Sequence, residues 1–225
     1  MDTYKKIARI VGVLFIIGTG AGILSGVFTG SFLDHPNFLV EISANKNQFM
    51  IGALLVLTMG FALAMVPVML YPIFKKYNEA LALGAVVFRG ALEAIGYMVF
   101  VISWFLLLLL SQAYVQAGSP DNSYFQTLGT VYLELGDWIG HLISIVFSLG
   151  ALMIYYLFYK TKLIPSWLSV WGLVGGLLYL AVPLLAMFGI ELEILYIPLA
   201  VQEMVFAVWL IVKGFNSSAI ISQAT

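Results

Sequence analysis

The sequence has few charged residues and no cysteine. Charged side chains make up 9% of its 225 residues, against about 25% in ordinary soluble domains, whereas hydrophobic residues make up 62%. A soluble domain of this size has too little interior to bury so much apolar surface. The absence of cysteine excludes disulfides, thiolate nucleophiles and iron–sulfur clusters. These shortages exclude a soluble enzyme and a disulfide-built secreted module, and they predict a protein embedded in the lipid bilayer.

Basic residues and enzyme motifs are also scarce. Ten Lys and Arg residues against eleven Asp and Glu residues give a net charge of −1, so the chain has no bulk basic surface for nucleic acid. The sequence contains no H-E-x-x-H zinc motif, no G-x-S-x-G and no phosphate-binding G-x-x-x-x-G-K-[ST]. Its two histidines alone cannot make a three-histidine zinc site. We therefore expect no nucleic-acid partner and no cofactor, and the sequence favours a role other than catalysis.

Six stretches are apolar enough to cross a bilayer, for which a helix needs about 20 residues. They are Ile7–Thr29, Phe49–Phe74, Leu81–Leu110, a stretch that begins between Leu128 and Trp138 and ends near Tyr159, Trp167–Phe188, and Ile194–Val212. Tyr124–Tyr132, ahead of the fourth stretch, is expected to be a separate interfacial helix. The pattern predicts an all-α fold, a polytopic transmembrane bundle of six spans, in which residues 1–225 form a single domain.

Lysine and arginine gather at one set of span ends, which is typical of cytoplasmic segments. They precede the first span, follow the second and the fourth, and close the sixth: Lys5, Lys6, Arg9, Lys75, Lys76, Lys160, Lys162 and Lys213. The opposite segments hold Lys46 among several acidic residues. We therefore expect both termini to be cytoplasmic.

Small residues recur every four positions in three of the spans, as in helices that pack closely in lipid. The positions are Gly18, Gly22, Gly26 and Gly30 in the first span, Gly136, Gly140, Ser144 and Ser148 in the fourth, and Gly172 and Gly176 in the fifth. Packing within one six-helix bundle explains this spacing. The alternative is a homodimer through Gly18, Gly22 and Gly26.

Ionisable residues inside the spans are the main functional signal, because inserting each one costs about 2.5–3.5 kcal/mol. Arg89 and Glu93 are four residues apart and share a face of the third span. Glu203 lies near the midplane of the sixth span. One arginine that faces two carboxylates leaves one negative charge uncompensated, unless a proton, a cation or His141 joins the group.

The fourth span carries a second polar stripe, in which Asp137 and His141 lie one turn apart in the outer half. We expect these two residues to line the approach to a pocket that also contains Arg89, Glu93 and Glu203. In that pocket Arg89 would compensate or bind an anionic group, while the two glutamates would carry exchangeable protons or a cation. The sequence thus predicts a transport-like or sensor-like site for a small ligand or cation.

Two other functions remain open at this point. In the first, the protein is a structural or interaction subunit, and its buried charges only fix the packing of the helices. In the second, it is a metal-dependent intramembrane enzyme in which Asp137, His141 and a glutamate hold the metal.

Several local motifs resemble a known family. Arg89-x-x-x-Glu93 is followed by Leu163-Ile-Pro165-Ser-Trp167-Leu-Ser169-Val-Trp171-Gly172, and Glu203 precedes Trp209-Leu-Ile-Val-Lys213-Gly214-Phe215. With Arg9-Ile-Val-Gly12, this pattern resembles the bacterial membrane-protein family of domain of unknown function 4386 over nearly the whole chain. A basic residue often follows the proline in that family, and here the position is Ser166. The resemblance implies a multi-pass protein of the bacterial inner membrane and assigns no activity.

Overall fold

The computed structural model describes residues 2–118, 123–216 and 218–219, and within these ranges it contains helices and no strand. In chain order the elements are α1 (Asp2–Leu33), α2 (Phe38–Ala44), α3 (Lys46–Phe74), α4 (Glu79–Ala85), the π-helix η1 (Val86–Leu92), α5 (Glu93–Ala117), α6 (Ser123–Thr161), α7 (Ser166–Ala186), the 3-10 helix η2 (Glu193–Tyr196) and α8 (Ile197–Val212).

Six of the described helical stretches are long and apolar enough to cross a membrane. They are Thr3–Leu33, Lys46–Phe74, Glu79–Ala117, Tyr124–Thr161, Ser166–Ala186 and Glu193–Val212. The prediction of an all-α bundle of six spans is therefore confirmed, and the chain is a multi-pass membrane protein.

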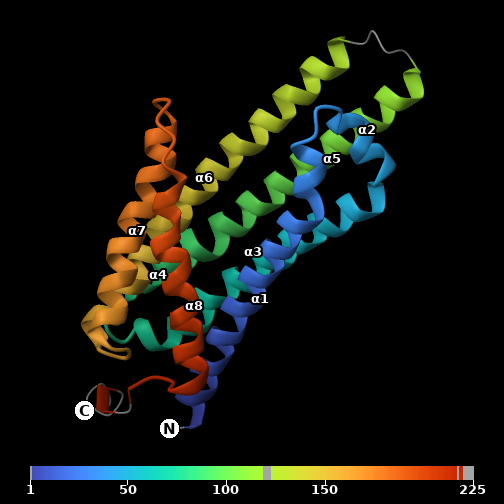
Figure 1. Cartoon of the computed structure of the whole chain (residues 1–225). Helices are drawn as coiled ribbons and strands as arrows, with labels where there is room; N and C mark the ends of the chain where they lie inside the picture. The colour runs from blue at the N-terminus through green and yellow to red at the C-terminus, as the bar shows by residue number, and fades with distance from the viewer. Residues whose placement is uncertain (1, 119–122, 217, 220–225) are drawn as a thin grey trace.

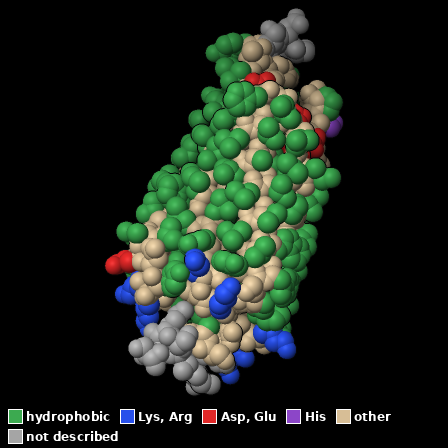
Figure 2. Space-filling view, turned by 90° about the vertical axis from the view of Figure 1, so that its left-hand side faces the viewer, with side chains coloured by type: hydrophobic (Ala, Val, Ile, Leu, Met, Phe, Trp, Pro, Cys, Tyr) green, Lys and Arg blue, Asp and Glu red, His purple; other side chains and the backbone are tan. Residues whose placement is uncertain are grey.

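The long helices form one elongated bundle in which α1 packs against α3 and α8, and α6 packs against α5 and α7 (Figure 1). The start of α1 and the end of α8 lie at the same end of the bundle. On the face that Figure 2 shows, lysine and arginine side chains gather at that end of the bundle. Most acidic side chains of this face lie at the opposite end. We call these the basic end and the acidic end.

Helix α6 begins earlier than the sequence predicted. It is one continuous helix of 39 residues, so Tyr124–Tyr132 is its first part and not a separate interfacial helix. The cause is tertiary packing, because α2 lies over α5 at the acidic end and its Phe38 ring also contacts α6 at Gly129. A Cβ at Gly129 would lie 2.8 Å from that ring. This contact with α2 holds the first part of α6 against the bundle, although Tyr124 and Val131 remain exposed.

Several of the periodic glycines pack within the chain. A Cβ at Gly18 would lie 2.6 Å from Leu63 of α3, and one at Gly172 would meet the Tyr155 ring of α6. Gly22 likewise faces α3, at Met59. The homodimer stays a prediction, and two of the three glycines on which it rests are already covered by α3.

Candidate functional site

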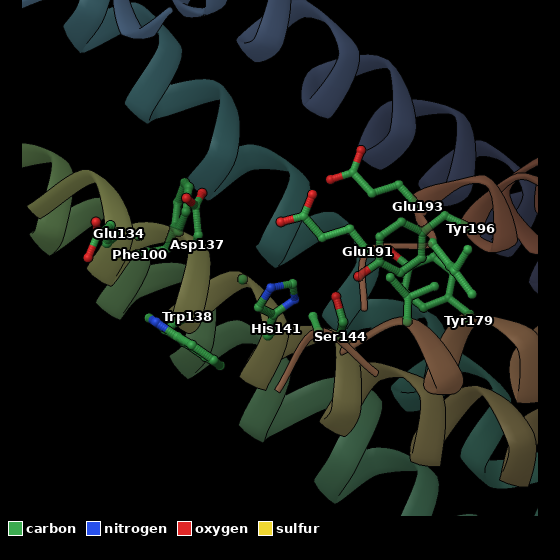
Figure 3. Close-up of a pocket in the computed structure, with 15 residues that line it drawn as sticks. Phe100, Glu134, Asp137, Trp138, His141, Ser144, Tyr179, Glu191, Glu193 and Tyr196 are labelled. Carbon is green, nitrogen blue, oxygen red and sulfur yellow. The ribbon is translucent and has the colours of Figure 1, made fainter. Parts of the chain in front are cut away.

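The predicted polar stripe of α6 lines a cavity at the acidic end of the bundle. Asp137 and His141 lie in a row along α6, and Glu191 and Glu193 face them from the segment that follows α7 (Figure 3). The cavity has a volume of about 550 Å³, which falls within the usual range of small-molecule sites. We call it the acidic-end cavity.

The small residues at the start of the α6 stripe form part of this cavity wall. Gly136 and Gly140 both line the cavity, and a Cβ at Gly140 would meet no atom within 4 Å. The expectation that this glycine packs against another helix is therefore wrong. Its missing side chain leaves open space instead.

A metal site is not assembled here. Among the described residues, no group of three or more His, Asp or Glu side chains is placed to hold a metal ion. The His141 ring instead packs edge-on against Trp138, with the ring centroids 5.7 Å apart. The described residues therefore do not bring together the set of ligands that a metal-dependent intramembrane enzyme would need.

The second polar group begins with an irregular turn in the third span. Between Val86 and Leu92 the helix widens to a π-helix, and the N–H of Glu93 donates to the carbonyl of Phe88, five residues earlier. Such turns are rare and occur frequently at functional sites. Helix α6 touches this turn at Gly150, where a Cβ would lie 2.5 Å from the backbone nitrogen of Arg89. Only glycine allows so close an approach.

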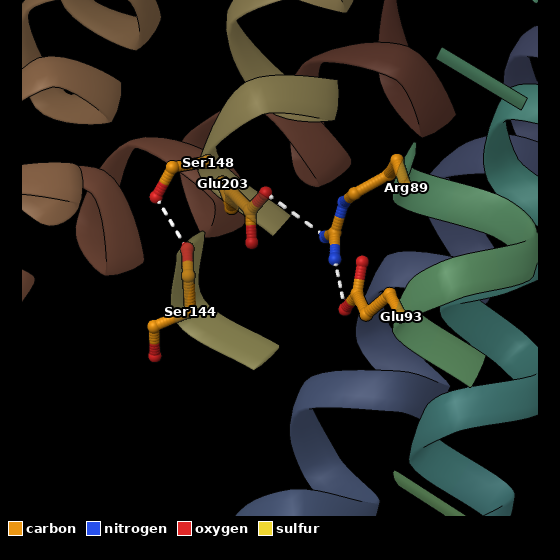
Figure 4. Close-up of polar contacts among 5 residues, drawn as sticks. All are labelled: Arg89, Glu93, Ser144, Ser148 and Glu203. Atoms are coloured by element: carbon orange, nitrogen blue, oxygen red, sulfur yellow. Dashed lines mark hydrogen bonds and ion pairs between the residues drawn. The ribbon is translucent and has the colours of Figure 1, made fainter. Parts of the chain in front are cut away.

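Three of the predicted site residues meet at this turn. Arg89 donates from Nη1 to Oε1 of Glu93, and from Nη2 to Oε1 of Glu203 at 3.2 Å (Figure 4). The residues Arg89 and Glu93 are each 1% exposed, and Glu203 is 9% exposed. The guanidinium carbon also lies 4.1 Å from the centroid of the Phe147 ring, a favourable cation–π contact. We call Arg89, Glu93 and Glu203 the ion cluster.

The ion cluster contains two carboxyl groups for a single arginine, so its charges do not balance when both glutamates are ionised. Oε2 of Glu93 and the hydroxyl of Tyr155 are buried and form no hydrogen bond of normal geometry among the described residues. Tyr97 is nevertheless within reach of Glu93, and Tyr155 is within reach of Glu203. His141 does not join the cluster, because it lies in the acidic-end cavity. Two buried carboxyl groups therefore share one arginine, an arrangement that favours a bound proton or cation on one of them.

A smaller cavity lies beside the ion cluster in the middle of the bundle. Its volume is about 260 Å³, which is room for several water molecules at roughly 30 Å³ each. Arg89 and Glu203 form part of its wall, together with Thr19 of α1 and Tyr97 of α5. We call it the central cavity. The ion cluster is therefore next to free space, although its side chains are almost fully buried.

Four of the five predicted residues thus divide between two cavities that share part of their walls, whereas Glu93 lines neither. Ser144 of α6 and Tyr179 of α7 line both cavities. Sequence reasoning placed Ser144 on a packing ridge and did not single out Tyr179, Glu191 or Glu193. A signal for Ser144 was present, because it lies one helical turn beyond His141 on the same stripe. Tyr179 has no comparable signal in a span that is apolar throughout.

Comparison with known proteins now identifies the family. The family model described as "Domain of unknown function (DUF4386)" matches residues 10–214. The chain belongs to this family. The resemblance stated from the sequence is thereby confirmed, and the match includes all residues of the ion cluster and both cavities. No curated protein and no solved structure matches the chain significantly. Membership of DUF4386 supports the multi-pass architecture and assigns no biochemical role.

Proposed function

We propose that this protein binds a small ligand or cation at the ion cluster and works as a transporter or sensor in the inner membrane of a bacterial cell. Both termini would then be cytoplasmic, with the basic end of the bundle on the same side. The observation that carries the proposal is that two buried carboxyl groups share one arginine beside the central cavity.

The charge balance of the ion cluster supports a bound cation or proton over pure packing. A structural ion pair needs one carboxylate for each arginine, and a buried excess charge costs several kcal/mol. Here Glu93 and Glu203 both contact Arg89, so two carboxyl groups face one positive charge. A proton or a cation on one glutamate would remove the excess. Because Glu203 faces the central cavity, it is the group that can exchange one.

The electrostatics of the acidic-end cavity support the same proposal. Four carboxyl groups line it, those of Glu134, Asp137, Glu191 and Glu193, and its lining includes no lysine or arginine. None of these carboxylates forms an ion pair with a lysine or arginine in the described ranges. A concave surface with charge of one sign raises the local concentration of ions of the opposite sign. Cations would therefore accumulate at this entrance.

The test is the substitution Glu203→Gln, which keeps the shape of the side chain and removes its charge. The purified protein is unfolded thermally at fixed ionic strength in LiCl, NaCl, KCl or choline chloride, each over a range of pH. A bound cation at 100 times its dissociation constant stabilises a protein by about 2.7 kcal/mol. We expect the wild type to be stabilised by at least one inorganic cation or by protons, and Glu203→Gln to lose that dependence.

Glu79→Gln is the matched control, because Glu79 is exposed at the start of α4 and lines neither cavity. It should respond to cations as the wild type does. Reconstituted vesicles with a dye inside for protons or for the stabilising cation then separate transport from sensing, since only transport moves the bound species across the bilayer. If Glu203→Gln and Glu93→Gln both match the wild type in stabilisation and flux, the ion cluster serves packing alone.

A further inference from the structure

We propose that Ser144 and Tyr179 form a constriction between the two cavities, and that it admits to Glu203 only a proton or a small inorganic cation arriving from the acidic end. We call this constriction the neck. The inference rests on the proposed function and adds to it a route, a direction and a limit on the size of the bound species.

The neck lies where the polar row of α6 ends. Figure 3 shows Asp137, His141 and Ser144 following one another toward Tyr179 and Tyr196. Ser144 and Tyr179 line the acidic-end cavity on one side and the central cavity on the other. These two side chains therefore belong to the wall between the cavities, and a species that crosses this wall would pass them.

Aromatic neighbours hold Tyr179 in place. Its ring centroid lies 4.2 Å from that of Tyr196 and 4.7 Å from that of Phe147. Phe147 is also the ring that faces the Arg89 guanidinium, and the Tyr196 hydroxyl is within hydrogen-bonding reach of Ser144. The neck is thus in contact with the ion cluster through Phe147, and with the start of α8 through Tyr196. Its width depends on these contacts.

Toward the basic end, buried aromatic rings fill the bundle. Phe15 packs on Phe206 with centroids 5.5 Å apart, Phe206 packs on Phe158 at 5.1 Å, and Phe158 packs on Phe74 at 4.9 Å. Each of these four residues is at most 1% exposed. The chain of rings begins beside Arg89, which Phe15 also faces, and ends at the last residue of α3. Buried rings therefore close the ion cluster toward the basic end, and the wall that its cavity shares with the acidic-end cavity lies on the other side.

The two cavities also differ in what they can hold. The acidic-end cavity, of about 550 Å³, combines carboxylates with the aromatic rings of Trp138 and Tyr196. Such a combination suits an organic ammonium ion as well as a metal cation. The central cavity has less than half that volume, about 260 Å³. Organic ammonium ions would stay in the first cavity, and protons or inorganic cations would continue past the neck.

The absence of cysteine makes the inference testable, because a single introduced thiol is the only one in the chain. Gly140→Cys reports on the acidic-end cavity, where there is room for a side chain, and Thr19→Cys reports on the central cavity. The probes are Ag⁺, a small inorganic cation, and the ethyltrimethylammonium methanethiosulfonate, a bulky organic one. Both are applied to sealed vesicles from each side in turn, and Asn37→Cys and Asn78→Cys identify the acidic-end and basic-end sides.

The expected result is a difference between the probes at Thr19→Cys alone. Gly140→Cys should react with both probes from the side that labels Asn37→Cys. Thr19→Cys should also react with Ag⁺ from that side. With the organic probe, Thr19→Cys should react at least tenfold more slowly than Gly140→Cys does. Similar rates of the two thiols with the organic probe would overturn the size limit. No reaction of Thr19→Cys with Ag⁺, or faster reaction from the other side, would overturn the route.

Variants of the neck should shift these rates in opposite directions. In the Thr19→Cys background, Tyr179→Ala should raise the rate of the organic probe at least tenfold, and Ser144→Leu should lower the rate of Ag⁺. Tyr114→Ala is the matched control, because its ring packs on Phe125 and lines neither cavity. If Tyr179→Ala does not fold, Ser144→Leu still decides, and an unchanged Ag⁺ rate would overturn the neck. These rates are measured without substituting Glu203, so failure of the neck is distinguishable from failure of the cation site.

Discussion

The ion cluster and the acidic-end cavity both contain carboxyl groups, but in opposite surroundings. In the ion cluster, Glu93 and Glu203 are buried and both contact Arg89. In the acidic-end cavity, Asp137 and Glu191 are exposed and have no ion-pair partner among the described residues. The number of acidic residues in a span therefore does not indicate what they do. Burial and the presence of a partner decide whether a carboxylate supports the fold or stays free to attract a ligand.

Removing Arg89 should have the largest effect on the free energy of unfolding, and it is the strongest test of the difference between the ion cluster and the acidic-end cavity. Arg89→Met leaves two buried carboxyl groups without a partner, which typically costs about 3–5 kcal/mol. The triple variant Arg89→Met, Glu93→Leu, Glu203→Leu removes all the charge and should lose less of the free energy of unfolding. Both values can be measured by titrating mixed micelles with a denaturing detergent. Equal losses would mean that the three groups do not stabilise one another.

Substituting two glycines of α6, one at a time, should have an intermediate effect on the free energy of unfolding and should distinguish the ion cluster from the acidic-end cavity. Gly150→Ala places a methyl group against the Arg89 backbone and should cost about 1–3 kcal/mol, as overpacking typically does. Gly140→Ala points a methyl group into the open acidic-end cavity and should cost little. Thermal unfolding in detergent compares the two variants directly. Equal destabilisation would contradict the close contact between α6 and η1.

Neutralising the free carboxylates should give the smallest effect on stability. Asp137→Asn and Glu191→Gln each remove an exposed charge that has no ion-pair partner among the described residues, so we expect changes within about 0.5 kcal/mol. The same thermal unfolding assay measures them. A loss above 2 kcal/mol in either variant would show that the acidic-end cavity also stabilises the fold.

The sequence predicted the spans because hydropathy depends on each stretch alone. It also predicted that Arg89 and Glu93 share one helix face, which is local, and that Glu203 lies inside a span, which follows from the hydropathy of that stretch. The early start of α6 was not predictable in this way, because it depends on contacts from α2.

The π-helix and the separation of the two cavities could not be predicted from the sequence either. In the π-helix, a backbone N–H donates to the carbonyl five residues earlier and not four residues earlier. In a span where nearly every neighbour is apolar, this change does not alter the hydrophobic pattern. Asp137 and His141 line a different cavity from Glu203, and the two cavities share Tyr179, which belongs to a different helix from all three. Such tertiary relations require the packed bundle.

The π-helix has a consequence for changes in chain length. A turn of this kind equals an α-helix into which one residue has been inserted. Deleting one residue between Val86 and Leu92 would return the span to a continuous α-helix and leave the faces of α4 and α5 in register. The same deletion elsewhere in the span would turn one part by about 100° against the other. The third span can therefore lose a residue with least disturbance at the turn that also positions Arg89.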